Sequence, residues 1–137
     1  MMTFVFDHVG LSVADLDAQR RFYAEALGLI ELEEHFEMPE AHVRSAILRA
    51  GNGLKIELIE RGGSEPQEFD GPFDGAGTQG YFHWAVYVDD LESAYAAVLD
   101  AGAREVSAPA DGVRPGMRFA YVKDPEGNLL ELVQPAG

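Results

Sequence analysis

An internal repeat constrains this chain more than any other feature of its sequence. A histidine stands near the start of each copy, at His8 and His83, which are 75 positions apart. A glutamate stands near the end of each copy, at Glu57 and Glu131, which are 74 positions apart. Both glutamates lie between aliphatic residues, and each is followed by a turn or the chain end. The repeat therefore predicts two similar modules that carry the same pair of polar side chains.

Hydrophobic periodicity predicts the same order of elements in both halves. In the first half we expect a strand over 3–13, a helix capped by Asp15 and ended by Gly28, and strands near 30–37, 42–50 and 54–60. In the second half we expect a strand over 81–88, a helix capped by Asp90 and ended by Gly102, and strands near 104–107, 117–123 and 128–134. Each half thus reads as βαβββ.

The fold class that follows is α+β, with two βαβββ modules in a single domain over 1–137. The modules cover about 3–60 and 81–135, and residues 61–80 link them. This linker is rich in Gly, Pro and acidic residues and is expected to be loop, either a plain connector or a lid over a site.

Composition excludes several classes of function. The net charge of −14 disfavours nucleic acid and anionic membranes as partners. No apolar run approaches the roughly 20 residues of a membrane helix, the first residues lack a basic signal-peptide region, and there is no cysteine. We therefore expect a cytoplasmic protein that acts on a small molecule.

The repeated polar residues predict a metal site. Strand alternation places the aliphatic residues of each strand against a helix and turns the histidine or glutamate to the opposite face. Two imidazoles and two carboxylates, from His8, Glu57, His83 and Glu131, suit Ni, Co, Zn, Mn or Fe. A divalent cation would also compensate the cost of burying two carboxylates. The four residues therefore predict one His2Glu2 centre.

Each of these residues taken alone is an ordinary core or surface residue, and only their register across the repeat favours a metal site. His35 and His42 take no part in the repeat, and we interpret them as surface or pocket-rim residues. Four cationic residues are candidate anchors for a substrate carboxylate or phosphate: Arg44, Arg114, Arg118 and Lys123.

The motif His8-x-x-Leu-x-Val-x-Asp-Leu, the triplets around Glu57 and Glu131, and Asp124-Pro-Glu-Gly-Asn128 together resemble the vicinal oxygen chelate superfamily. This superfamily includes glyoxalase I, methylmalonyl-CoA epimerase, extradiol dioxygenases and bleomycin-resistance proteins. The resemblance covers nearly the whole chain, and its ligand pattern is most similar to those of glyoxalase I and methylmalonyl-CoA epimerase.

The resemblance implies a cupped mixed β-sheet around the metal and a homodimer. It implies a lyase or isomerase that works next to a carbonyl through a metal-bound enediolate, with Glu131 in proton transfer. Glu37 roughly matches a second proton-transfer glutamate of the epimerases. Ser12 stands where glyoxalase I commonly has an arginine for glutathione, so glutathione and coenzyme A both stay open.

Two alternatives remain from the sequence. A metal-free resistance protein would bind a drug in an open groove lined by Trp84, Tyr81 and Phe82. An Fe(II) extradiol dioxygenase would need only His8, His83 and Glu131 as ligands.

Overall fold

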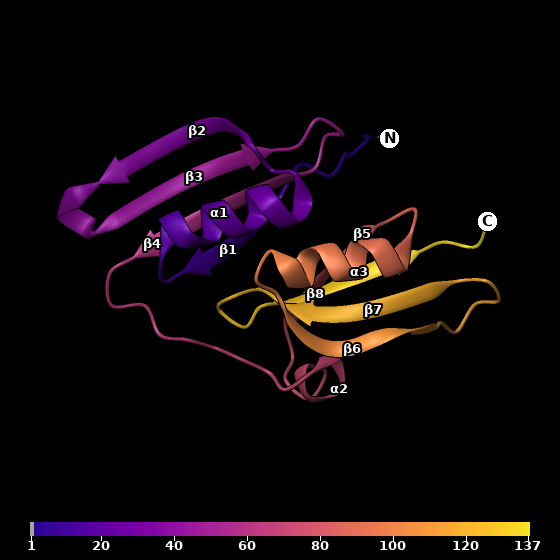
Figure 1. The fold of residues 1–137 in the computed structure, drawn as a ribbon. Coiled ribbons are helices and arrows are strands. Elements are labelled where there is room, and N and C mark those ends of the chain that lie inside the picture. The colour runs from indigo at the N-terminus through magenta and orange to yellow at the C-terminus, as the bar shows by residue number, and fades with distance from the viewer. Residues whose placement is uncertain (1) are drawn as a thin grey trace. The chain divides into compact units, whose positions relative to one another are not determined.

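The computed structural model describes residues 2–137, which form two compact units, Met1–Glu65 and Pro66–Gly137 (Figure 1). Unit 1 contains β1 (Val9–Val13), α1 (Leu16–Leu27), β2 (Glu31–Met38), the 3-10 turn η1 (Pro39–Ala41), β3 (Val43–Arg49) and β4 (Lys55–Arg61). Unit 2 contains α2 (Pro72–Gly75), β5 (His83–Tyr87), α3 (Leu91–Asp100), β6 (Arg104–Asp111), β7 (Arg118–Lys123) and β8 (Leu129–Gln134). The α+β class and the two βαβββ modules are confirmed.

The two sheets have the same topology. The strand order is β1-β4-β3-β2 in unit 1 and β5-β8-β7-β6 in unit 2. In each sheet the first strand runs parallel to the last, and the remaining pairs are antiparallel. Gly10 faces Glu57 in the β1–β4 pair, and Ala85 faces Glu131 in the β5–β8 pair. The repeated glutamates therefore occupy equivalent places in the two sheets.

One face of each sheet packs against the helix of its own unit. Ile56 and Leu58 of β4 are fully buried, as is Leu132 of β8, while Glu57 and Glu131 between these aliphatic positions are only partly buried. Helix α1 contacts β3 and β4, and α3 contacts β6, β7 and β8 (Figure 1). Burial of these side chains drives the packing because it removes apolar surface from water. The face of each sheet away from the helix is then the one on which Glu57 or Glu131 lies.

Both long helices begin as the sequence predicts. Asp15 accepts a hydrogen bond from the Ala18 backbone N–H (3.0 Å) and Asp90 from that of Ser93 (3.2 Å). Gly28 ends α1 with a φ of 71°, in the left-handed region that glycine adopts without strain.

A second anchor at the helix starts comes from the last strand of each module. The Leu16 backbone N–H donates to Glu60 Oε2, and that of Leu91 donates to Gln134 Oε1, both over 2.8 Å. Each bond satisfies one of the backbone N–H groups that a helix leaves unpaired in its first turn. The repeat therefore uses an acid in one module and an amide in the other for the same task.

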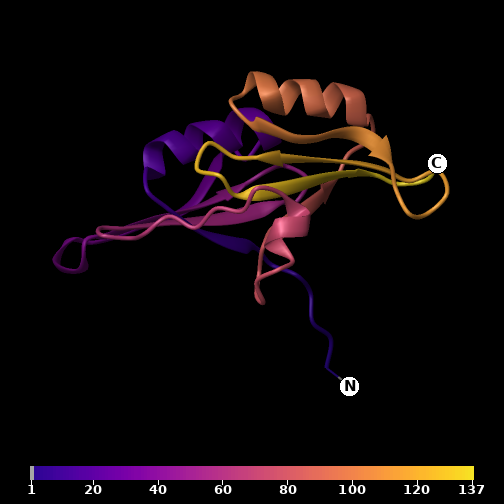
Figure 2. The ribbon, with the colours of Figure 1, turned by 90° about the horizontal axis from the view of Figure 1, so that it is seen from below.

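The N-terminal strand is shorter than predicted. Residues 2–8 have no regular secondary structure, and β1 begins at Val9. Figure 2 shows this segment extending away from the sheet of its own unit. The prediction of a strand from residue 3 is wrong because alternation of apolar residues continues through Phe4 and Phe6, which are 85% and 77% exposed and pair with no strand.

One further boundary differs from the prediction. Strand β6 continues through Pro109 to Asp111, with register shifts around Ser107 and Ala110. Proline is tolerated here because β6 is an edge strand.

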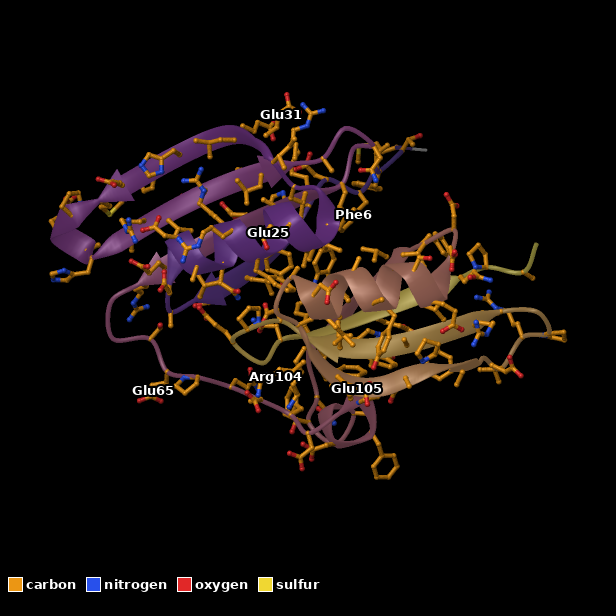
Figure 3. All side chains as sticks on the ribbon, in the orientation of Figure 1. Phe6, Glu25, Glu31, Glu65, Arg104 and Glu105 are labelled. Carbon is orange, nitrogen blue, oxygen red and sulfur yellow. The ribbon has the colours of Figure 1, made fainter. Side chains whose placement is uncertain are left out.

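The linker is not a uniform loop, because its second part is tied to unit 2. Helix α2 lies within it, and Glu68 accepts hydrogen bonds from Arg104 (3.1 Å; labelled in Figure 3) and Lys123 (3.2 Å). A Cβ at Gly127 would come 2.1 Å from Glu68 Oε1. Residues from Pro66 on therefore belong to the second unit. No helix among residues 2–137 is long and apolar enough to cross a bilayer.

The anchor at Glu60 predicts a pH-dependent stability. Its hydrogen bond from Arg44, and then that from the Leu16 N–H, hold the pKa of Glu60 below its usual range. A carboxyl with a lowered pKa stabilises the fold above its unfolded pKa of about 4.3, and this stabilisation is lost as the pH falls through the folded value. In Glu60→Gln, the side-chain amide oxygen still accepts the hydrogen bond from the Leu16 N–H, as Gln134 does from Leu91. The ion pair with Arg44 is lost.

We therefore expect Glu60→Gln to lower the free energy of unfolding by about 1–2 kcal/mol at pH 7, measured by urea denaturation. The wild type and the variant should converge as the pH falls below about 4. Gln134→Ala, which removes the neutral bond of α3, should show a cost that does not change over this range. An equal loss at pH 7 and pH 3 for Glu60→Gln would contradict the assigned role of its charge.

Candidate metal centre

The first polar pair lies in unit 1, where β1 and β4 run side by side. His8, directly before β1, places Nε2 3.5 Å from Glu57 Oε1 of β4. The two side chains are 33% and 29% exposed, so the pair is accessible from one side. Gly10 stands opposite Glu57, and a Cβ added there would lie 3.7 Å from Oε1. The absence of a side chain at Gly10 keeps the space beside the carboxylate open.

The second pair lies in unit 2 at the equivalent place. His83 of β5 places Nε2 3.3 Å from Glu131 Oε1 of β8, and the side chains are 23% and 16% exposed. Ala85 stands opposite Glu131. The same parallel pairing of first and last strand thus brings a histidine and a glutamate together twice.

The spacing within each pair fits two ligands of one cation. Donor atoms about 2.1 Å from a tetrahedral or octahedral ion lie about 3.0–3.4 Å from each other, and the observed separations are 3.5 Å and 3.3 Å. Imidazole nitrogen and carboxylate oxygen are donors that Zn, Ni, Co, Mn and Fe(II) accept. Each pair therefore has the donor types and the spacing of two ligands of a divalent metal ion.

Each pair lies within its own unit. Among residues 2–137 the structure brings no three or more His, Asp or Glu side chains into a group that could hold a metal ion. His8 joins Glu57, and His83 joins Glu131.

The second pair has a neighbour that the sequence reasoning missed. Tyr121 of β7 stands directly opposite Glu131, and its hydroxyl lies 3.4 Å from His83 Nε2. Burial, followed by the charge of Glu131, raises the pKa of Tyr121 to about 12, so the hydroxyl stays protonated and can donate. The matching position in unit 1 is Ile47, which stands opposite Glu57. Because the equivalent residue in unit 1 is apolar, the repeat does not mark Tyr121 as a part of the site.

Aromatic rings surround His83. The Phe82 ring lies 4.5 Å from the His83 ring and the Tyr121 ring 5.3 Å from it, both edge to face, and Phe119 continues the row at 6.0 Å from Tyr121. Tyr81, in contrast, is fully exposed. Phe82 therefore packs on the histidine, while Tyr81 is open to solvent.

Glu37 lies on the other face of the sheet from Glu57. It pairs with Arg44, which pairs with Glu60, and this row belongs to the helix side of the sheet. A register shift between Leu32 and Glu34 changes the alternation of β2. Glu34 pairs with Ile47, and Ile47 pairs with Glu57, so these three residues share a face.

This placement does not support a role for Glu37 beside Glu57. Its own neighbour is His35, whose Nε2 lies 3.4 Å from Glu37 Oε1 on the same exposed strand. The His35–Glu37 pair thus has nearly the spacing of the two repeated pairs but no counterpart in the other module.

Most of the candidate anion anchors are already engaged. Arg44 donates to Glu60 over 3.1 Å and Lys123 to Glu68 over 3.2 Å. Arg118 pairs with Glu92 over 2.5 Å. Arg114 contacts the sulfur of Met117. An incoming substrate anion would have to displace a carboxylate from three of these four cations.

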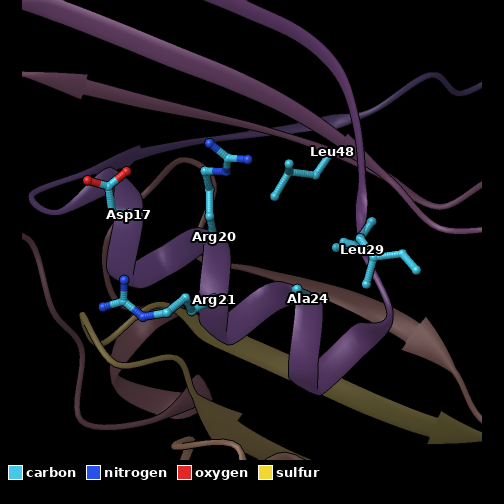
Figure 4. A pocket seen from close by; sticks show the side chains of 7 residues that line it. Asp17, Arg20, Arg21, Ala24, Leu29 and Leu48 are labelled. Atoms are coloured by element: carbon cyan, nitrogen blue, oxygen red, sulfur yellow. The ribbon is translucent and has the colours of Figure 1, made fainter.

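Two shallow grooves lie on the helix side of unit 1, away from the Glu57 face. One, of about 440 Å³, is bounded by Asp17, Arg20 and Arg21 of α1 and floored by Leu29 and Leu48 (Figure 4). The other, of about 360 Å³, is lined by seven residues: Glu37, Pro39, His42, Val43, Arg44, Glu60 and Gly62. His42 has a φ of 57°, which is uncommon for a residue other than glycine. These grooves contain none of the four repeated residues His8, Glu57, His83 and Glu131.

Comparison with known families identifies the fold and the class. Residues 5–132 match the model of the Glyoxalase/Bleomycin resistance protein/Dioxygenase superfamily. The chain therefore belongs to this superfamily, and the resemblance inferred from its motifs is confirmed.

Relatives within the superfamily carry two kinds of name. The chain is 34% identical over 131 residues to a probable lactoylglutathione lyase of Vibrio parahaemolyticus, with 93% of this chain and 88% of the relative covered. It is 31% identical over 139 residues to the mitochondrial methylmalonyl-CoA epimerase of Mus musculus, with 93% and 71% covered. Similarity is thus shared between a lyase and an epimerase.

Solved structures agree on the fold. Glyoxalase I from Zea mays matches with a TM-score of 0.74 and 24% identity, covering 96% of this chain and 44% of the other. The chain also spans only 44% of the lactoylglutathione lyase of Arabidopsis thaliana, at 30% identity over 132 residues. Some members are therefore more than twice as long as the region that this chain matches.

Proposed function

We propose that His8, Glu57, His83 and Glu131 together bind one divalent metal ion and that the protein is a lyase or isomerase acting next to a carbonyl. The observation that carries the proposal is the recurrence of the imidazole–carboxylate pair at equivalent register in both modules, at 3.5 Å and 3.3 Å. A structural ion pair needs no such recurrence. Membership of the superfamily supports the same choice.

A divalent cation bound by these donors would act as a Lewis acid toward a carbonyl oxygen of the substrate and stabilise negative charge there. Ni, Co, Zn, Mn and Fe(II) all suit two nitrogen and two oxygen donors. We also propose a homodimer and a cytoplasmic location, by analogy with other members of the superfamily.

Glu131 is the proposed base. A carboxylate oxygen of Glu131 that does not bind the metal would take a proton from the carbon next to the carbonyl and return it to the same or the neighbouring carbon. The hydroxyl of Tyr121, opposite Glu131 on β7, would orient the carboxylate. Only 16% of the Glu131 side chain is exposed, so water would compete weakly for the proton.

The substrate class follows from the named relatives. The relatives include a probable lactoylglutathione lyase and a methylmalonyl-CoA epimerase, so hemithioacetals and 2-methyl-branched acyl-CoA esters are the first substrates to test. The two classes differ in their anionic parts, so testing both distinguishes between them.

Metal content tests the ligand assignment. We expect about one Ni, Co, Zn or Mn per wild-type chain, and loss of the metal in His83→Ala because one of four donors is removed. The measurement is elemental analysis of protein purified without a metal-affinity tag.

The matched control is His35→Ala. It removes a histidine whose Nε2 lies 3.4 Å from a glutamate, as in the proposed ligand pairs. His35, however, lies on the opposite face of the sheet from Glu57. His35→Ala should keep the metal. Equal loss in both variants, or no metal in the wild type after reconstitution, would refute the assignment.

Proton transfer tests the role of Glu131. In Glu131→Gln we expect the exchange of the substrate carbon proton with deuterium from solvent to fall by at least about 100-fold, measured by NMR. Glu37→Gln removes a carboxylate from the other face and should leave the rate within about twofold. A reversed result would assign the base to Glu37 and contradict the geometry described above.

A further inference from the structure

The two histidines of the repeat differ in what holds their second nitrogen. His8 Nδ1 lies 2.7 Å from Asp7 Oδ2, a short hydrogen-bond distance. His83 Nδ1 is buried and has no hydrogen-bond partner, and the residue before it is Phe82, whose ring packs against the imidazole. The repeat thus has a histidine in both modules, but only His8 has a hydrogen-bond partner at its Nδ1.

Asp7 is itself held from a second side. Lys55 Nζ lies 3.3 Å from Asp7 Oδ1 and 3.1 Å from Glu33 Oε2. The Lys55 side chain is only 18% exposed, although Asp7 is 66% exposed. One carboxylate oxygen of Asp7 therefore faces the imidazole and the other faces a fixed ammonium group.

This arrangement decides which nitrogen of His8 carries the proton. A carboxylate accepts and does not donate. Asp7 Oδ2 lies 2.7 Å from Nδ1, whereas Glu57 Oε1 lies 3.5 Å from Nε2, so the closer carboxylate favours the proton of a neutral His8 on Nδ1. Its Nε2 then presents a lone pair toward Glu57, which is the state that a metal ligand requires. His83 has no acceptor at Nδ1, and the carboxylate beside it, that of Glu131, lies 3.3 Å from Nε2 instead.

We propose that Asp7, held by Lys55, is a positioning residue that fixes the Nδ1–H tautomer of His8 and thereby makes His8 the better prepared of the two histidine ligands. The metal part of this inference rests on the proposed function. The tautomer part does not, because it concerns the protein without metal.

The first test reads the tautomer directly. Nitrogen-15 NMR of the imidazoles in the metal-free protein should show His8 as the Nδ1–H form, and Asp7→Ala should lower the population of that form. The hydrogen bond to Asp7 also raises the pKa of His8, so the spectra are recorded at a pH above the titration of His8, where its imidazole is neutral. Residues 2–8 lie outside the sheet, so the variant should fold normally.

The second test reads metal affinity. Loss of a group that orients a ligating histidine lowers metal affinity by about 10–100-fold, and we expect about tenfold for Asp7→Ala with Co²⁺ because Asp7 is exposed. Glu33→Ala is the matched control, since it removes the same charge from the same lysine without touching His8. It should change the affinity less than about twofold.

The outcomes separate this inference from the proposed function. An unchanged His8 tautomer in Asp7→Ala would overturn the inference, and so would equal losses of Co²⁺ affinity in Asp7→Ala and Glu33→Ala. If the wild type binds no metal while the tautomer changes as expected, the proposed function fails and the positioning of His8 by Asp7 stands.

Discussion

The parallel pairing of the first and last strands in each module is the constraint on which the rest of this structure depends. It sets Gly10 opposite Glu57 and Ala85 opposite Glu131. Because side chains alternate along a strand, the neighbours of each glutamate turn inward beneath a helix while the glutamate turns to the other face. The histidine two positions before the small residue then lies beside the carboxylate. One packing rule thus produces both the core and the polar pair, and the repeat applies it twice.

The repeat also shows where equivalent positions have diverged. Glu60 and Gln134 satisfy the same backbone N–H at the start of a helix, but only Glu60 joins an ion pair. Ile47 and Tyr121 stand opposite the two glutamates. These differences leave the fold unchanged and alter the chemistry around each pair. The two modules therefore resemble each other in architecture and differ in the groups that surround their candidate ligands.

Much of the fold could be predicted from the sequence, because helix caps such as Asp15 and Gly28 and the alternation around Glu57 are local signals. Of the site, only the residues that the repeat and these local signals mark could be predicted. The face of Glu37 could not be read because a register shift in β2 leaves no mark in composition. Asp7 and Tyr121 were missed because the repeat does not preserve them, and their importance depends on contacts to His8 and His83 that only the structure shows.

The central claim is that both modules serve one metal ion, and cobalt NMR tests it most directly. Co²⁺ shifts the proton resonances of any imidazole bound to it. After titration to one Co²⁺ per chain, we predict that the resonances of His8 and His83 are shifted together and in proportion, while those of His35 and His42 keep their positions. Shifts for only one of the two ligand histidines, for His35 instead, or for none would contradict the account of a shared centre.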